Sequence, residues 1–185
     1  MRVVVVTPPD PVVDLERVKQ HLEVEHDDRD DLIAGMIAAA TAHIDGPDGW
    51  LGRAIGVQTL ETGFWSFDPC GMRLPFPPVT EIVSVTYRDE SGAEQTVPTD
   101  DIELFDDLIF PGWMKAWPNA RPMRASVRVR YRAGYSTVPD PIIAAILLMV
   151  GDLWRNRDTV AALGAAKIPM STTVENLLAP FRVYR

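Results

Sequence analysis

Residues 138–160 read VPDPIIAAILLMVGDLWRNRDTV, and this stretch predicts a long helix that is more apolar than one small core needs. Pro139 and Pro141 favour a helix start, because a proline ring holds φ near the helical value. Either the helix is an ordinary buried element, or other subunits cover its surplus apolar surface. The apolar side chains recur at the three-and-four spacing of one helical stripe, which comprises Ile142, Ile143, Ile146, Leu147, Val150, Leu153 and Trp154.

The sequence predicts neither a membrane span nor a disulfide within the chain. The apolar run at 142–150 is far shorter than the roughly 20 residues that cross a bilayer, and the N-terminal MRVVVV is too short for a signal peptide. Cys70 is the only cysteine, which fits a reducing compartment. A net charge of −8 argues against a protein that wraps nucleic acid, because such binding depends on neutralising phosphates. We therefore expect a soluble intracellular protein with one domain, or one domain carrying an insertion.

Two helices are expected near the N-terminus. Asp14 can cap a short helix through Val18 and Leu22. Aspartates cluster at 27–31, where negative charge favours the start of a following helix. The second helix has one apolar face, made of Leu32, Ile33, Met36, Ile37, Ala40 and Ile44.

Residues 57–132 change to the period of strands. Seven short apolar runs are separated by Pro, Gly, Asp and Asn, which suggests a small β-sandwich or barrel. The segment DESGAE at 89–94 contains Ser91 and Gly92, and it predicts a hairpin turn.

The run at 124–132 alternates cleanly and predicts a strand with one basic face. Its arginines face solvent, an acidic neighbouring subunit or DNA, and DNA is the least favoured because Tyr131 points away from them. The basic face comprises Arg124, Ser126, Arg128, Arg130 and Arg132, opposite Ala125, Val127, Val129 and Tyr131. We expect its partners among carboxylates such as Asp100, Asp101, Asp106 and Asp107.

Motifs that carry chemistry are missing from the sequence. It has no glycine-rich phosphate loop, CxxC pair, HExxH or GxSxG. His21 and His26 are five residues apart, so they do not lie side by side on a helix. We therefore expect no catalytic, cofactor-binding or metal-ligating residue and no cofactor. An enzyme of unfamiliar type remains an alternative.

Five segments together resemble a known family. They are DDLIAGMIAAAT (30–41), RLPFPPVTEIVSVTYRDESGAEQTV (73–97), VRVRYRAGY (127–135), VPDPIIAAILLMVGDLWRNRD (138–158) and ENLLAPFRVYR (175–185). In their order and spacing they resemble the head-tail connector, or adaptor, proteins of HK97-type tailed phages and gene transfer agents. The segment at 106–122, rich in Trp and Pro, departs from the family pattern.

The resemblance implies an α+β fold. It would consist of an α-helical bundle, an inserted small β-sandwich and a C-terminal tail. Residues 1–56 would form the N-terminal helical part, and residues 57–135 the inserted β-sandwich. Residues 136–163 would form the long helix that completes the bundle, and residues 164–185 a linker and a portal-docking tail.

The implied function is structural. Such proteins form a ring of about twelve copies between the portal protein and a stopper or other tail component. DNA would pass through the ring without specific binding, and no membrane would be involved. The protein would be located in the neck of a virion or phage-like particle, and in the host cytoplasm during assembly. The alternative is another ring-forming neck component, a stopper or a tail terminator, but those are mostly β-built.

Two interfaces are expected. The C-terminal tail should be mobile when free and should dock onto the portal, because a short helix after a linker cannot bury its own apolar side chains. Its interface residues are Leu177, Leu178, Phe181, Arg182, Tyr184 and Arg185. The expected contacts between subunits are Trp154 and Arg157, at the end of the apolar helix, and Arg128 and Arg130 on the basic strand face.

Overall fold

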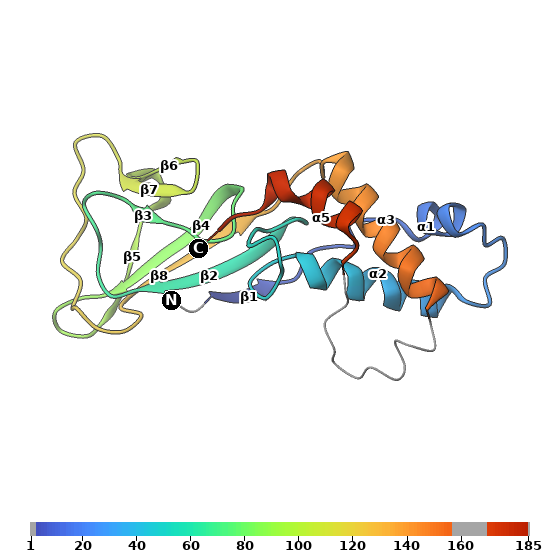
Figure 1. Ribbon diagram of the computed structural model, residues 1–185. Helices are drawn as coiled ribbons and strands as arrows, with labels where there is room; N and C mark the ends of the chain where they lie inside the picture. The colour runs from blue at the N-terminus through green and yellow to red at the C-terminus, as the bar shows by residue number, and fades with distance from the viewer. Residues whose placement is uncertain (1–2, 157–169, 185) are drawn as a thin grey trace. The chain divides into compact units, whose positions relative to one another are not determined.

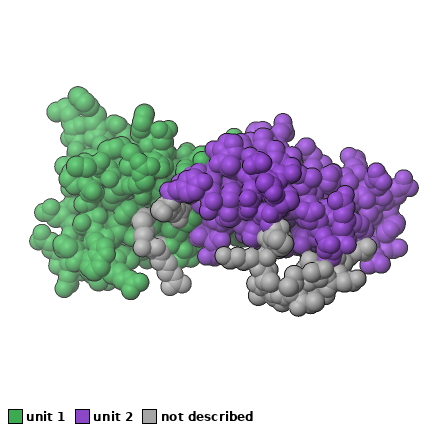
Figure 2. Space-filling model, in the orientation of Figure 1, with its two compact units in different colours: residues 1–10, 53–136 green, residues 11–52, 137–185 purple. Residues whose placement is uncertain are grey.

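The computed structural model describes residues 3–156 and 170–184, and the chain divides into two compact units (Figure 1). Unit 1 comprises Met1–Asp10 and Arg53–Ser136, and unit 2 comprises Pro11–Gly52 and Thr137–Arg185 (Figure 2). The described strands belong to unit 1 and the described α-helices to unit 2. The expected α+β class is therefore confirmed.

Unit 1 contains a larger antiparallel sheet of five strands, in the order β1-β2-β8-β4-β5. The hairpin expected at 89–94 joins β4 to β5, and Arg88 pairs with Glu94 across it. The carboxylate of Asp89 stabilises the turn by accepting hydrogen bonds from Ser91 Oγ and the Ala93 amide. The strands are β1 (Val3–Thr7), β2 (Gln58–Phe64), β8 (Val127–Ala133), β4 (Val79–Arg88) and β5 (Glu94–Val97).

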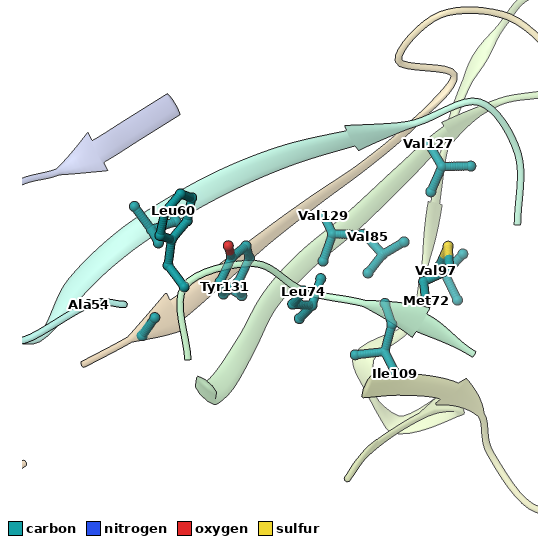
Figure 3. Close-up of a cluster of buried hydrophobic side chains, with 12 residues drawn as sticks. Ala54, Leu60, Met72, Leu74, Val85, Val97, Ile109, Val127, Val129 and Tyr131 are labelled. Carbon is teal, nitrogen blue, oxygen red and sulfur yellow. The ribbon is translucent and has the colours of Figure 1, made fainter. Parts of the chain in front are cut away.

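A smaller antiparallel sheet of three strands has the order β3-β7-β6. It contains β3 (Met72–Arg73), β6 (Ile102–Phe105) and β7 (Leu108–Pro111), and the 3-10 turn η1 (Thr99–Asp101) precedes β6. Both sheets contribute side chains to one buried cluster (Figure 3). Its members are Ala54, Leu60, Met72, Leu74, Phe76, Val85, Val97, Ile109, Val127, Val129, Tyr131 and Ala133.

Strand β8 crosses the middle of the larger sheet and follows the alternation read from the sequence. Val127, Val129 and Tyr131 are fully buried, while the arginines between them remain on the open face. Tyr131 buries its ring in the cluster, and its hydroxyl donates a 2.6 Å hydrogen bond to the Pro75 carbonyl. The polar end of this core side chain is therefore satisfied.

Strand β1 corrects the expectation that residues 1–56 are helical. Val3–Thr7 pairs with β2 as an edge strand of the larger sheet, with a bulge between Val5 and Thr7. Four consecutive valines show neither helical nor strand periodicity, so the pattern alone gives no assignment. Their branched side chains nevertheless favour the extended conformation.

Unit 2 contains the helices α1 (Leu15–Leu22), α2 (Asp30–Ile44), α3 (Asp140–Arg155) and α5 (Thr172–Leu178), followed by the 3-10 turn η2 (Ala179–Phe181). The predicted apolar face of α2 is buried, except for Leu32, which is exposed. None of the helices among the described residues has the length and apolar character needed to span a bilayer.

Helix α3 is the long helix expected from residues 138–160, and it starts after Pro139. Its core side chains include Ile142, Ile146 and Val150, which are fully buried. Ile143 is only half-buried, as are Leu147, Leu148 and Trp154. None of the large apolar side chains of α3 is exposed, so the structure does not show the surplus apolar surface that the sequence suggested. The predicted extension to residue 163 lies outside the described residues.

The connection from α1 to α2 contains a buried charge. The side chain of Lys19 is 6% exposed, and its ammonium is paired with Asp27 and lies 3.0 Å from Asp30 Oδ1. The hydrogen bonds that Lys19 donates to Asp27 and Asp30 raise the pKa of Lys19 above its usual value. The hydrogen bond from Lys19 lowers the pKa of Asp27 below its usual 3.8. Both shifts favour the charged pair in the folded protein.

Candidate assembly surfaces

The C-terminal segment, residues 171–184, is folded against its own unit, which corrects the expectation of a free and mobile tail. Ser171 caps α5 by accepting a hydrogen bond from the Val174 amide. Val174 and Leu178 are fully buried, and α5 packs on α3. Leu178 is therefore a core residue and is not accessible to a partner. The sequence could not show this, because a seven-residue helix does not specify the surface that it covers.

The segment after η2 is attached to the loop at residues 50–52. The Val183 amide donates a 2.8 Å hydrogen bond to the Leu51 carbonyl. The Arg182 guanidinium lies 4.1 Å from the centroid of the Trp50 ring and 4.9 Å from that of Tyr184. Gly52 has a φ of +65°, and a Cβ there would lie 2.7 Å from the Val183 carbonyl oxygen. Only glycine fits this approach without strain.

The accessible part of the expected portal interface is smaller than the sequence suggested. Tyr184 is 78% exposed, which makes it the most accessible of the expected residues that the structure describes. Leu177, Phe181 and Arg182 are half-buried. Arg185 lies outside the described residues. The candidate surface is therefore centred on Tyr184.

The basic face of β8 has carboxylate partners, but not the ones expected. Arg130 donates to Glu61 on β2 at 2.8 Å, and Arg128 is paired with Glu94 on β5. A third pair on this face joins Arg132 to Glu81 on β4, at 3.4 Å. The strand register places Glu61 and Glu81 opposite Arg130 and Arg132 on the two strands beside β8. Glu94 reaches Arg128 from β5, one strand further away. The face is therefore largely neutralised within the chain.

Two of the aspartates expected to pair with β8 have other partners. Asp107 pairs with Arg73 at 2.8 Å, and Asp101 pairs with Lys115 at 3.1 Å. These pairs belong to the smaller sheet and the loop that follows it. The prediction was wrong because residue types do not reveal which strands become neighbours.

Trp154 and Arg157 were expected at a contact between subunits. Trp154 is half-buried near the end of α3, and it interacts with other groups of the chain. Arg157 lies outside the described residues. The contact of Trp154 with a neighbouring subunit remains a prediction.

Two exposed apolar groups in unit 1 were not predicted. Phe105, Trp113 and Met114 are 70%, 86% and 91% exposed, around the β6–β7 hairpin. Trp65 is 66% exposed, and Met123 is exposed near it. The sequence signal was the Trp-rich and Pro-rich segment at 106–122, where large side chains lack a strand or helix period.

The described residues show little that suggests chemistry. Among residues 3–156 and 170–184, no three His, Cys, Asp or Glu side chains gather in a way that could hold a metal ion. An open cavity of about 220 Å³ lies beside Tyr87, Val97 and Trp117. The two charged groups in its lining, Asp101 and Lys115, form an ion pair with each other. The cavity therefore offers no unpaired charged group to a ligand.

Comparisons with known proteins agree with the motifs. Residues 12–64 match the family described as phage gp6-like head-tail connector protein. A chain in the virion of a native gene transfer agent particle is similar in fold, with a TM-score of 0.75 and 20% identity, covering 100% of this chain and 97% of that chain. A chain in the neck of an empty gene transfer agent particle, computed with C6 symmetry, is also similar in fold. Its TM-score is 0.73, and it is 21% identical over 100% of this chain and 97% of that chain.

A third similar chain comes from the neck of a native gene transfer agent particle computed with C12 symmetry. Its TM-score is 0.67, with 19% identity over 100% of this chain and 97% of that chain. No curated protein matches this chain. The expected resemblance is confirmed: residues 12–64 resemble phage head-tail connector proteins in sequence, and the whole chain resembles a chain of a gene transfer agent particle in fold.

Proposed function

We propose that this protein is a structural head-tail connector, or adaptor, in the neck of a tailed phage or phage-like particle. The observation that carries the proposal is the fold match to a gene transfer agent virion chain, which extends over 100% of this chain and 97% of that one. The family match at residues 12–64 supports the same function from sequence. The protein then acts through contacts with other proteins rather than through catalysis.

The presence of two different units supports a connector over a stopper or a tail terminator. Those neck components are mostly built from strands, whereas α1, α2, α3 and α5 make a helical unit here. The matched region at residues 12–64 includes α1 and α2, together with strand β2. The family resemblance in sequence therefore includes the N-terminal part of the helical unit.

The assembled form is a ring of about twelve copies. The similar chains come from necks computed with C6 and C12 symmetry, which supports a cyclic arrangement. DNA passes through the channel, and a chain with net charge −8 lowers the tendency of DNA to adhere to it. The location is the particle neck, and assembly takes place in the host cytoplasm.

The portal protein is the proposed partner of the C-terminal segment. Tyr184 presents an exposed aromatic ring, and Arg182 lies between that ring and Trp50. Aromatic and arginine side chains are enriched among residues that dominate binding at protein interfaces. A stopper or another tail component occupies the opposite side of the ring.

The function is tested by mixing the purified full chain with the portal protein encoded beside it. We expect the two proteins to sediment together and electron microscopy to show a second ring on the portal. A portal that stays bare at every concentration of the chain would contradict the proposed function.

The portal contact is tested separately with Tyr184→Ser. We expect this exposed side chain to contribute to binding, so the variant should bind the portal about tenfold or more weakly while its melting temperature stays unchanged. Leu32→Ser is the control, because Leu32 is an exposed apolar side chain on a different helix of the same unit. Equal binding by Tyr184→Ser and wild type would remove Tyr184 from the interface.

A further inference from the structure

Two surfaces of unit 1 combine exposed apolar side chains with charge of opposite sign. The basic patch comprises Trp65, Arg88, Arg121, Met123 and Arg124. The acidic patch comprises Glu103, Phe105, Asp106, Trp113 and Met114. Neither belongs to the C-terminal surface or to the arginine pairs of β8.

Backbone hydrogen bonds bring the basic patch together at one end of the larger sheet. The Arg121 amide donates to the Arg88 carbonyl at 2.9 Å, and the Met123 amide donates to the Trp65 carbonyl at 3.3 Å. The strand ends also fix the position, because Phe64 and Tyr87 both pair with Val127. Main-chain bonds therefore place the patch, and its side chains remain available.

The basic patch has unpaired positive charge. Arg88, Arg121 and Arg124 are exposed, and none of them forms an ion pair with the residues that the structure describes. The nearby carboxylate of Asp89 accepts hydrogen bonds within its own hairpin turn, and Glu90 is exposed beside it. Three arginines and two carboxylates leave the area basic.

The acidic patch lies on the outer side of the β6–β7 hairpin. Glu103 and Phe105 are both exposed on β6, two residues apart, so they share one side of the strand. The Trp113 amide donates a 3.0 Å hydrogen bond to Glu103 Oε1, which places the exposed Trp113 next to this side. Asp106 follows Phe105 in the hairpin turn. Large apolar side chains and carboxylates thus form one surface.

The two patches lie apart on unit 1. Figure 1 shows the β6–β7 hairpin at the upper edge of this unit and the β4–β5 turn, which follows Arg88, at its lower edge. A unit with complementary patches at separate edges can contact two copies of itself at once. Such head-to-tail contacts close into a ring when the rotation between copies fits.

We propose that the basic patch of one copy binds the acidic patch of the next copy, and that this contact joins unit 1 of neighbouring subunits in the ring. The inference rests on the proposed function, because the ring supplies the second copy. Opposite charges set the orientation of the contact, while Trp65 and Trp113 supply buried apolar area.

A second copy fits the basic patch better than DNA does. The matching acidic and apolar surface is present on the same unit, so each chain carries both halves of the contact. The net charge of −8 also opposes the approach of a nucleic acid. DNA binding to the basic patch is the competing outcome, and it is measured on the same variants.

The test reverses the charge of each patch in the full-length chain. One variant carries Arg88→Glu, Arg121→Glu and Arg124→Glu, and a second carries Glu103→Lys and Asp106→Lys. Self-association is measured by sedimentation velocity over a concentration series, and the number of copies bound to the portal is counted by electron microscopy. We expect each variant to associate about tenfold or more weakly than wild type, because like charges then face each other.

A third variant combines all five reversals and exchanges the sign of both patches. We expect it to recover association, which a merely misfolded chain would not do. The control carries Arg17→Glu and Arg29→Glu, which reverse two exposed arginines of unit 2 away from the expected contact at Trp154. The control should associate like wild type.

The outcomes separate this inference from the proposed function. Rings that form equally well with wild type and with the reversed variants would overturn the inference and leave the connector function intact. Self-association that requires both patches, together with a portal that stays bare, would support the inference and contradict the function. A wild-type chain that stays monomeric in solution and on the portal would overturn the inference. The inference would also be overturned if the variant with three reversed arginines lost DNA binding but kept its self-association.

Discussion

The contacts inside unit 1 differ in kind from the contacts inside unit 2. In unit 2, buried side chains such as Leu178 join α5 to α3, and the connection from α1 to α2 holds the buried ammonium of Lys19. Unit 1 repeats the same kind of contact along neighbouring strands, with apolar side chains on one face and pairs such as Arg130–Glu61 on the other. We therefore expect a substitution at one of these buried sites of unit 2 to cost more than one in an ion pair on the open face of unit 1.

The largest effect is expected from Leu178→Ala, which breaks the attachment of α5 to α3. Leu178 is fully buried, and removing such a side chain costs about 2–5 kcal/mol of unfolding free energy. Leu177→Ala is the matched control, because Leu177 is the neighbour of Leu178 but is only half-buried. Hydrogen exchange should rise in α3 for the first variant and change far less for the second. Equal exchange in both would show that α5 contributes little to unit 2.

An intermediate effect is expected from Lys19→Met, which leaves Asp27 and Asp30 without their buried cation. The control is Lys115→Met, because Lys115 is also paired with an aspartate but is exposed. Thermal unfolding at neutral pH should show a lower melting temperature for Lys19→Met and little change for the control. Equal melting temperatures in both variants would contradict a structural role for the buried ammonium of Lys19.

The same pair predicts a pH dependence. The pKa of Asp27 is lowered in the folded protein, so its contribution is present above the usual pKa of 3.8 and is lost as pH falls through the folded value. The pKa of Lys19 is raised, so its contribution is present below the usual 10.5 and is lost only as pH rises through a higher value. The difference in melting temperature between wild type and Lys19→Met should shrink below pH 3.8. A constant difference down to pH 2, roughly two units lower, would contradict the prediction.

The smallest effect is expected from Arg130→Gln in unit 1. Its ion pair with Glu61 lies on a partly exposed face, where such pairs contribute about 0.2–1 kcal/mol. A double-mutant cycle with Glu61→Gln measures the coupling directly. Val129→Ala, at the neighbouring buried position, should cost more. A coupling well above this range would show that unit 1 also depends on single contacts.

Much of the fold could be predicted wherever the sequence has a local period. The alternation at 127–132 gave the buried and open faces of β8, and Ser91 with Gly92 marked the hairpin. Before the strand begins the expected alternation was wrong, because Ala125 is exposed and Ser126 is buried. The stripe in α3 gave its buried side, including Ile146 and Val150. In these elements, a few neighbouring residues are sufficient to determine the local structure.

The errors arose where distant segments meet. The partners of Arg128 and Arg130 depend on strand register, which residue types do not encode. The burial of Leu178 depends on a contact between α5 and α3. The expected portal surface was therefore too large, and the exposed patches of unit 1 were missed because Trp65 and Trp113 follow no period.

The order of the segments along the chain also affects synthesis. The strands of unit 1 are all available once β8 ends at Ala133, so this unit can fold while translation continues. Unit 2 must wait for Val174 and Leu178, because these residues complete its core. During that interval, the apolar faces of α2 and α3 lack their final cover. A nascent chain paused between these points should therefore recruit chaperones through its helices rather than its strands.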